Sequence, residues 1–360
     1  MTRPVLFVTN YAPPFRTGAF AALHEREDVA FALIGGGVRH GGDVPAGPPP
    51  FPVLHVSERA VGRLAASGRY RAVVAGLSGR VALPAAYTGA RLARVPFVLW
   101  ATIWAHPRTA AHALSYLPLR HLYRHADAIA TYGPHVSAYV RSKGARGPVV
   151  EAPQSVDDAF WTGPAVPERR APFQALFAGR VEPEKGVATL LEAWRAAALP
   201  ESALVLAGEG PAPTGAPGAM PVGRLEPSVL RNFYAGSDVV VVPSVPTRDF
   251  REPWGLVVNE AFDREVPVIA TDAVGAAAGG LVQNERTGLV VPAGDAAALA
   301  AALRRLHGDA ALRTRLGAAG REAVRAYSHA AWARGMSAAL AAAGASGAAD
   351  GPHRGPDRRC

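Results

Sequence analysis

Short apolar runs alternate with longer segments of helical length along most of the chain. The runs are rich in Val, Leu, Ile and Ala, which is typical of strands buried on both faces of a parallel sheet. The segments between them repeat apolar residues at helical spacing. In the first 151 residues this alternation predicts a doubly wound α/β domain. The predicted strands span residues 5–9, 29–34, 53–56, 72–75, 97–101, 128–131 and 149–151, and the predicted helices span 58–66, 81–92, 109–125 and 135–143.

The alternation stops in a proline-containing stretch and then starts again. Residues 152–170 hold three prolines and little periodicity, which is typical of a connection between domains. We therefore predict a first domain over residues 1–155, a linker over 156–171 and a second α/β domain over 172–327. The predicted strands of the second domain span 175–178, 204–207, 239–242, 268–270 and 289–291, and its helices span 187–197, 228–234, 256–262 and 296–306.

The last part of the chain divides into helices and a polar tail. Apolar spacing predicts helices near residues 310–327 and 329–343, and we expect the C-terminal helices over 328–343 to pack back on the first domain. Residues 344–360 are polar, rich in Gly and free of aromatic side chains, so they cannot bury a core. They are predicted to form a disordered tail.

Composition excludes several classes of protein. A chain of 360 residues with 49% hydrophobic and 19% charged residues is long enough and apolar enough for two globular domains. The single cysteine, Cys360, allows no intramolecular disulfide or cysteine-rich zinc site, which favours a reducing compartment. The first apolar run is too short for a secretion signal, and no run reaches the ~18 residues of a membrane-spanning helix. We expect a cytoplasmic protein whose membrane contact is at most peripheral, at the inner face.

The net charge of +9 is confined to the first half of the sequence. Residues 1–171 carry 19 Lys+Arg against 10 Asp+Glu, whereas residues 172–360 carry 19 of each. A basic half attracts an anionic partner, and a phosphorylated or membrane-bound small acceptor fits better than nucleic acid, because no nucleic-acid motif accompanies the charge. The expected contact surface is the helix 109–125, where arginines lie beside apolar residues: Arg108, Arg120 and Arg124 beside Leu114, Tyr116, Leu117, Leu119 and Leu122.

Two doubly wound domains joined by a linker bind ligands where the carboxyl ends of their strands face a common cleft. In the second half, the strand ending at residue 178 leads into Gly179, Arg180 and, five residues further, Lys185, followed by a helix. A glycine and two cations before a helix N-terminus suit a diphosphate. A solvated basic loop is the alternative for this segment taken alone.

A pair of glutamates brackets the start of a later helix. Glu252 precedes it, Glu260 lies inside it, and the amides of Gly255, Leu256 and Val257 are free to meet phosphate oxygens between them. Carboxylates on either side can accept hydrogen bonds from sugar hydroxyls. A capping acid and a surface acid would be the ordinary explanation for two isolated glutamates.

The wider motif resembles the nucleotide-sugar half of the glycosyltransferase family 4 enzymes. Residues 252–260 read EPWGLVVNE, similar to the family's E-x7-E motif, and 266–275 and 284–292 continue the likeness as VPVIATDAVG and NERTGLVVP. It extends upstream through FAGRVEPEKGV at 177–187 and covers residues ~172 to ~327 densely. In the first half the likeness is thinner, with Gly18 in the position of the family's first glycine loop and His106 near its cleft histidine.

The resemblance implies a GT-B fold, in which two Rossmann-like domains face each other across a cleft. It also implies an enzyme that moves a sugar, with retention, from a nucleotide diphosphate sugar to a hydroxyl acceptor, either lipid-linked or a small glycoconjugate precursor. No metal or other cofactor is implied. The implied catalytic residues are His106, Glu252, Arg180 and Lys185, and the implied donor-binding residues are Gly18, Gly179, Arg180, Lys185, Glu252, Gly255, Leu256, Val257 and Glu260.

Within these implied roles, Arg180 and Lys185 hold the diphosphate, Glu260 the ribose, and Glu252 the donor sugar. His106 faces the reacting sugar from the first domain. The chain departs from the family at Thr17, at Gln154 in the linker turn, and in the longer loop 247–251 before Glu252. Two alternatives stay open: a nucleotide-sugar epimerase of similar fold, and a non-catalytic nucleotide-sugar-binding protein.

Overall fold

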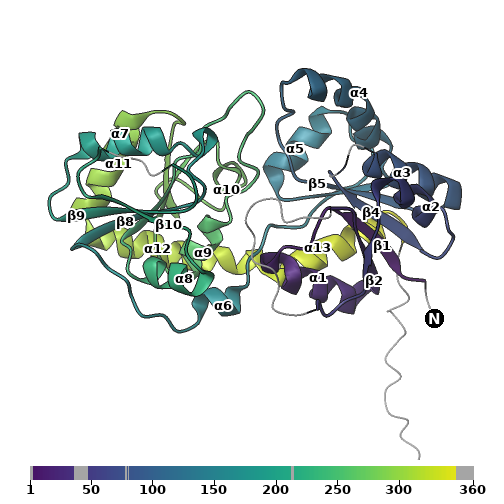
Figure 1. Cartoon of the computed structure of the whole chain (residues 1–360), viewed down its shortest axis with the longest axis horizontal. Coiled ribbons are helices and arrows are strands. Elements are labelled where there is room, and N and C mark those ends of the chain that lie inside the picture. Colours follow the sequence, from purple (N-terminus) through teal and green to yellow (C-terminus); the bar gives the residue numbers. More distant parts are fainter. Residues whose placement is uncertain (1–2, 36–47, 78, 80, 212–214, 346–360) are drawn as a thin grey trace, which may run out of the picture.

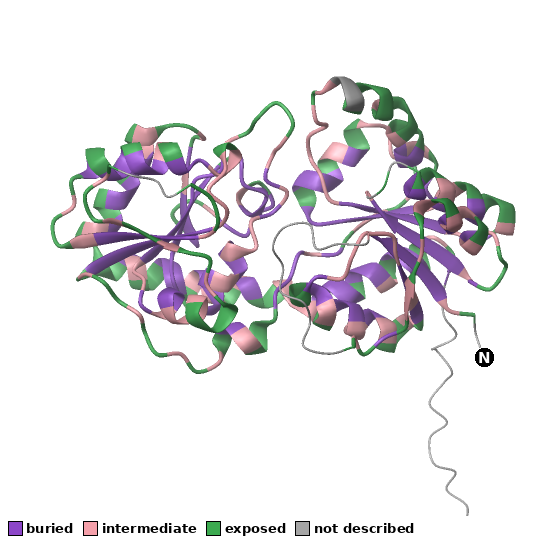
Figure 2. Ribbon diagram, viewed as in Figure 1, coloured by how far each residue is buried: buried purple, intermediate pink, exposed green. Residues whose placement is uncertain are grey.

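A computed structural model describes residues 3–35, 48–77, 79, 81–211 and 215–345. Two α/β halves lie side by side, each built around one parallel sheet (Figure 1). The predicted doubly wound α/β architecture is therefore confirmed in both halves. In Figure 2 the strands of each sheet are buried and the outer surfaces of the surrounding helices are exposed, as expected for sheets covered on both faces.

The first sheet has seven strands in the order β3-β2-β1-β4-β5-β6-β7, all parallel. Every strand predicted for this half is present, with ends that differ by at most one residue. The strands are β1 (Val5–Thr9), β2 (Val29–Leu33), β3 (Val53–His55), β4 (Ala72–Gly76), β5 (Phe97–Ala101), β6 (Ala128–Thr131) and β7 (Val149–Glu151).

The helices of this half follow the sequence pattern except for the first. Helix α1 (Pro14–Glu27) was not predicted, because Pro13 precedes it, Pro14 is its first residue and Gly18 lies inside it. Proline is favoured at the first helical position, so this helix begins where its sequence looks least helical. The other helical segments are η1 (Glu58–Ala60), α2 (Val61–Ala65), α3 (Ala82–Ala93), α4 (Ala110–His125) and α5 (Pro134–Ser142).

The second sheet has six parallel strands in the order β10-β9-β8-β11-β12-β13. The predicted strands are present, with ends that differ by at most two residues. Strand β10 was not predicted, because its sequence, AMPVG, contains a proline. The strand forms nevertheless, because it lies at the edge of the sheet, where the loss of one backbone hydrogen bond is tolerated. The strands are β8 (Phe173–Ala178), β9 (Ser202–Ala207), β10 (Ala219–Gly223), β11 (Val239–Val242), β12 (Val268–Thr271) and β13 (Gly288–Val291).

The helices around this sheet match the predicted segments, with short additions. The unpredicted α6 (Asp158–Thr162) is capped by the Asp157 carboxylate, which accepts a hydrogen bond from the Phe160 amide at 3.0 Å. The remaining helical segments are η2 (Pro183–Lys185), α7 (Val187–Ala197), α8 (Pro227–Ala235), α9 (Val257–Asp263), α10 (Gly275–Ala278), α11 (Ala296–Gly308), α12 (Ala310–Val324) and η3 (Arg325–Tyr327).

The chain crosses between the halves twice, and the two crossings meet. Helix α13 (His329–Ala342) returns from the second half and packs against α1, β6 and β7 (Figure 1). Where it begins, Ser328 pairs with Val156 of the linker, and the Ser155 hydroxyl lies 3.0 Å from Nδ1 of His329. The predicted tail lies outside the described residues from position 346 onward.

Candidate active site

A cavity of about 420 Å³ lies between the two halves, at the carboxyl ends of their strands. From the first half it is lined by Thr102, Tyr132 and Gln154, which follow β5, β6 and β7. We call these three residues the first wall. The residues from the second half are Phe177, Ala178, Gly179, Arg180, Lys185, Val241, Val242, Ser244, Glu252, Pro253, Trp254, Gly255, Leu256 and Val257.

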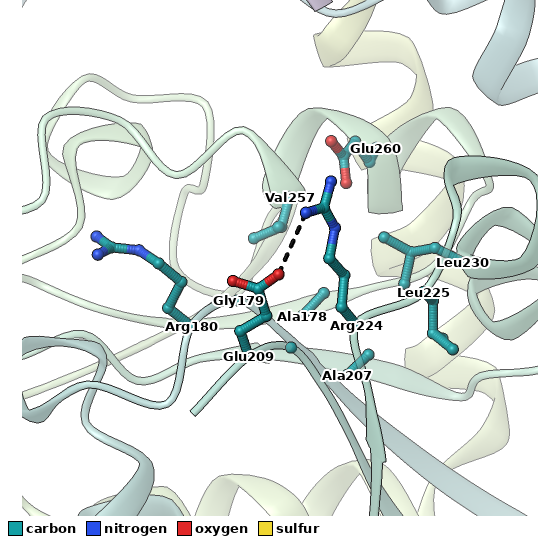
Figure 3. A pocket seen from close by; sticks show the side chains of 11 residues that line it. Ala178, Gly179, Arg180, Ala207, Glu209, Arg224, Leu225, Leu230, Val257 and Glu260 are labelled. Carbon is teal, nitrogen blue, oxygen red and sulfur yellow. Dashed lines mark hydrogen bonds and ion pairs between the residues drawn. The ribbon is translucent and has the colours of Figure 1, made fainter. Parts of the chain in front are cut away.

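A second cavity of about 260 Å³ adjoins the first and belongs to the second half alone (Figure 3). The two cavities share Ala178, Gly179, Arg180 and Val257, so one ligand can extend through both. In Figure 3, the Arg224 side chain reaches toward Glu260 and is joined to Glu209 by an ion pair of 3.2 Å. The apolar side chains of Leu225 and Leu230 form the far side of this cavity.

The loop after β8 owes its shape to its glycines. Gly186 has a φ of +68°, and a Cβ there would lie 1.9 Å from the Pro243 carbonyl oxygen, so only glycine fits this close approach. The Arg180 guanidinium extends from the loop and lies 2.5 Å from a carboxylate oxygen of Glu182 and 4.0 Å from one of Glu184. Both partners are partly exposed, so an anion entering the cavity can compete for the guanidinium.

Lys185 and Glu252, 67 positions apart in the sequence, form an ion pair inside the cavity. Glu252 is 8% exposed and also accepts a hydrogen bond of 3.2 Å from the Ser244 hydroxyl. The ammonium group of Lys185 lies 5.3 Å from the ring centre of Phe250. The predicted phosphate-binding cation and the predicted sugar-binding acid are therefore partners in this structure.

Glu260 lies in α9, where it is partly buried and lines the smaller cavity. The Tyr234 hydroxyl donates a hydrogen bond of 2.7 Å to its carboxylate. Burial raises the pKa of Glu260 to about 7, the charge of Asp263 adds to the rise, and the bond from Tyr234 opposes it. Gly255, Leu256 and Val257 line the larger cavity around the start of this helix, and Gly255 adopts a φ of +91°.

Two of the predicted site residues lie away from both cavities. The ring of His106 is 5.1 Å from that of Tyr116, and its Nε2 is 2.7 Å from the backbone oxygen of His112, so it packs against α4. Gly18 lies in α1, where a Cβ would be 2.4 Å from Cδ2 of His329. Neither residue lines either of these two cavities, and the catalytic role of His106 and the donor-binding role of Gly18 stay predictions.

Sequence reasoning did not assign the first wall to the site. Thr102, Tyr132 and Gln154 are separated by 22 residues or more and share no common motif. The available signal was their position, because each follows a predicted strand whose carboxyl end points into the cleft. Gln154 had been singled out only as a departure from the family pattern.

Residues beside the cavity join the two halves directly. The Trp104 indole donates a hydrogen bond of 2.9 Å to the backbone oxygen of Glu252, and the Arg251 guanidinium lies 3.5 Å from the Trp104 ring centre. His135 donates to the Pro253 oxygen at 3.1 Å. These contacts fix the position of Glu252 and Pro253 relative to the first half.

The described ranges contain no helix with both the length and the hydropathy needed to cross a membrane. In the same part of the chain, no three His, Cys, Asp or Glu residues gather in a way that could hold a metal ion.

Residues 172–309 match the protein family described as "Glycosyl transferases group 1". The D-inositol 3-phosphate glycosyltransferase of Nocardioides sp. is 39% identical over 121 residues, which cover 32% of this chain and 24% of that relative. The chain spans less than half the length of the curated relatives it matches.

Solved structures resemble the chain over nearly its whole length. HepE of Anabaena in complex with UDP has a TM-score of 0.73 at 16% identity, covering 94% of this chain and 99% of its own. Sucrose-phosphate synthase from Thermosynechococcus elongatus has a TM-score of 0.68 at 21% identity, covering 93% and 97%. At such identities the likeness concerns the fold, and it confirms the GT-B arrangement. Residues 172–309 are therefore similar to the group 1 glycosyltransferases, and the chain as a whole has the GT-B fold.

Proposed function

We propose that this protein is a retaining, metal-independent glycosyltransferase of family 4. It would transfer a sugar from a nucleotide diphosphate sugar to a hydroxyl acceptor. The observation that carries the proposal is the pair of joined cavities, with Arg180 where they join, Lys185 and Glu252 in the larger cavity and Glu260 in the smaller. This order matches the parts of the donor: sugar, diphosphate and nucleoside.

The donor would lie along the two cavities in one direction. Its diphosphate would meet Arg180, where the cavities join, and Lys185 in the larger cavity, and its ribose would meet Glu260 in the smaller cavity. The base would pack against Leu225 and Leu230 in the smaller cavity. The sugar would then occupy the larger cavity, with Glu252 as an acceptor for its hydroxyls.

Catalysis in this arrangement would be largely electrostatic. Negative charge develops on the diphosphate as the glycosidic bond breaks, and fixed cations placed there stabilise it more in the transition state than in the ground state. Lys185 is held by Glu252 before the donor arrives. Binding would therefore exchange one anionic partner of Lys185 for another and release the Glu252 carboxylate to the sugar hydroxyls.

Retention and family 4 membership rest on the likeness of residues 252–260 to the E-x7-E motif. In that account the acceptor attacks from the face that the diphosphate leaves, and a departing phosphate oxygen takes the proton of the acceptor hydroxyl. Neither an epimerase nor a binding-only protein is favoured, because the matched family and its named relatives transfer glycosyl groups.

The acceptor is proposed to be anionic, either a lipid-linked molecule at the cytoplasmic membrane face or a soluble phosphorylated precursor. The membrane version is supported by α4, where Leu114 is 83% exposed and Leu117 is 69% exposed near Arg120. Leu122, which was predicted on the same apolar stripe, is buried in the core instead. The proposed contact surface is therefore the stretch of α4 from Leu114 to Arg120, without Leu122.

The donor is tested by thermal unfolding of the full chain with UDP, GDP and ADP and with their sugars. A ligand at 100 times its dissociation constant adds ~2.7 kcal/mol to stability, a shift that is easily measured. Stabilisation by one nucleotide and its sugar is expected. If none of them stabilises the protein, the proposal is wrong.

Two further assays address the finer parts. Transfer activity is expected to survive EDTA, because Arg180 and Lys185 supply positive charge at the diphosphate. A loss of transfer activity on adding EDTA that Mg²⁺ restores would contradict metal independence.

Sedimentation with anionic and neutral liposomes at low and high salt tests the surface of α4. Equal sedimentation in all four conditions would contradict the membrane contact, and the soluble phosphorylated acceptor would then be the remaining proposal.

A further inference from the structure

Two buried polar side chains of the first wall face the same cavity as Lys185 and Glu252. Tyr132 is 6% exposed and Gln154 is 5% exposed. The side-chain oxygen Oε1 of Gln154 has no hydrogen-bond partner among the described residues. A buried acceptor without a partner is costly, so its presence in a ligand cavity indicates that a ligand supplies the missing donor.

The backbone of Gln154 is fixed from the opposite half. Asn259 donates from its amide nitrogen to the Gln154 backbone oxygen at 3.3 Å, and the Trp254 indole holds Asn259 with a hydrogen bond of 2.7 Å. All three residues are buried. The free oxygen of the Gln154 side chain therefore extends from an anchored backbone.

Tyr132 is held by an arginine behind it. Arg16, in the first turn of α1, is only 8% exposed and donates a hydrogen bond of 2.6 Å to the Tyr132 hydroxyl oxygen. Its guanidinium lies 4.8 Å from the ring centre of Trp100. No carboxylate of the described residues forms an ion pair with it.

This contact determines what the Tyr132 hydroxyl can do. Its oxygen accepts the hydrogen bond from Arg16, so its own hydrogen must point elsewhere, and a cationic donor on the oxygen makes that O–H a stronger donor. Burial raises the pKa of Tyr132 against the opposing effects of Arg16 and Gln154, which keeps the hydroxyl protonated at neutral pH.

We propose that Tyr132 and Gln154 form a hydroxyl-recognition site for the transferred sugar and that Arg16 is the positioning residue of this site. Tyr132 donates a hydrogen bond to one sugar oxygen, and Gln154 accepts one from a neighbouring hydroxyl. The ligand class is a neutral sugar with adjacent hydroxyl groups, held between this site and Glu252. The inference rests on the proposed function, because it takes the ligand of the larger cavity to be the sugar of the donor.

The test compares the affinity of the full chain for UDP and for UDP-glucose by calorimetry, or for the nucleotide and nucleotide sugar found by the donor screen. Tyr132→Phe and Gln154→Leu should each lower the affinity for the nucleotide sugar by about tenfold and leave that for the nucleotide unchanged. Tyr123→Phe is the matched control, since it removes a buried tyrosine hydroxyl on α4 that has no hydrogen-bond partner among the described residues and lines neither cavity.

Arg16 is tested with the same two ligands. Arg16→Gln should reduce the preference for the nucleotide sugar over the nucleotide as strongly as Tyr132→Phe, and Arg16→Lys should restore part of it, because lysine keeps a charged donor near the phenol oxygen. A merely structural role for Arg16 would weaken binding of both ligands together. That result would overturn the positioning role.

Different results would contradict the proposed function and the hydroxyl-recognition site. If no nucleotide binds, the proposed function fails. If the nucleotide binds but its sugar adds no affinity in the wild type, or if Tyr132→Phe and Gln154→Leu keep the full preference for the nucleotide sugar, the hydroxyl-recognition site is wrong and the donor proposal stands.

Discussion

The two sides of the larger cavity are built from different chemistry. The second half contributes Arg180, Lys185 and Glu252, which are charged and paired with one another or with nearby carboxylates. The first wall contributes a hydroxyl, a phenol and an amide, and Arg16, which donates a hydrogen bond to Tyr132, does not line the cavity. The charge facing the cavity is therefore the opposite of what the net charges suggest. The first half carries the whole basic excess of the chain, and yet the wall that it presents to the cavity is neutral.

The difference teaches where charge is useful in such a site. Fixed charges close to a departing diphosphate stabilise the charge that develops on it. A charge facing the sugar from the other side would add a desolvation cost without such a gain, whereas neutral donors and acceptors still discriminate between hydroxyl patterns. We therefore expect substitutions in the second half to change affinity for the nucleotide and substitutions in the first wall to change selectivity for the sugar.

The largest expected effect is on nucleotide binding, from Lys185→Gln. Loss of a charge-assisted hydrogen bond to the diphosphate should cost ~1.5 to 3 kcal/mol, or roughly tenfold to a hundredfold in affinity by calorimetry. The matched control is Lys143→Gln, which removes the chain's other lysine from a position above the ring of Tyr139 in the first half. Equal nucleotide affinities for Lys185→Gln and Lys143→Gln would mean that Lys185 does not bind the diphosphate and that the two halves do not differ in this respect.

Glu260 should make nucleotide binding depend on pH. Because its pKa is raised to about 7, the carboxylate gains its charge, and its full capacity to accept ribose hydrogen bonds, as pH rises through 7. Affinity should rise over that interval in the wild type and rise less in Glu260→Gln. The titration of the ligand's own phosphate is common to both proteins, so parallel affinity curves would contradict the assignment.

The same group affects stability with the opposite sign. An acid whose folded pKa lies above its ordinary value of 4.5 destabilises the folded state as it ionises, so this contribution to stability is lost between about pH 4.5 and 7. Thermal unfolding should therefore show that Glu260→Gln gains stability relative to the wild type as pH rises through this window. A constant difference from pH 4 to 8 would mean that the pKa is not raised.

Trp104→Phe is expected to have a smaller effect than the substitutions of Lys185 and Glu260, because it weakens only the contact between the two sides of the cavity. It removes one hydrogen bond to the Glu252 backbone, worth ~0.5 to 1.5 kcal/mol, and should also lower nucleotide-sugar affinity slightly. The control is Trp194→Phe, which loses a hydrogen bond of 2.8 Å to the Pro217 oxygen within the second half. If both variants lower the affinity equally, the contact at Trp104 does not couple the halves.

The smallest effect is expected from Glu209→Gln in the smaller cavity. Its ion pair with Arg224 is exposed, and such pairs contribute ~0.2 to 1 kcal/mol to stability at most. Chemical unfolding should barely distinguish the variant from the wild type. A large drop in nucleotide affinity would instead show that Glu209 takes part in binding the nucleotide.

The sequence determined the fold class and the charged half of the site. Strands buried on both faces appear as uninterrupted apolar runs, so both sheets could be read from residue order, apart from the edge strand β10. Arg180 and Lys185 share one loop, and Glu252 and Glu260 flank one helix start, so local motifs identify them. Local spacing is visible in a sequence because a loop or a helical turn brings near neighbours together.

Only the tertiary structure decided the first wall and the partners within the site. Thr102, Tyr132 and Gln154 come from three separate strand ends, and Arg16 comes from a helix that its prolines concealed. Lys185 and Glu252 carry compatible charges in the sequence, but their pairing needs β8 and β11 to lie side by side. Packing likewise placed Gly18 against His329, 311 positions away, because such long-range contacts depend on how the elements are arranged in space, which residue spacing does not encode.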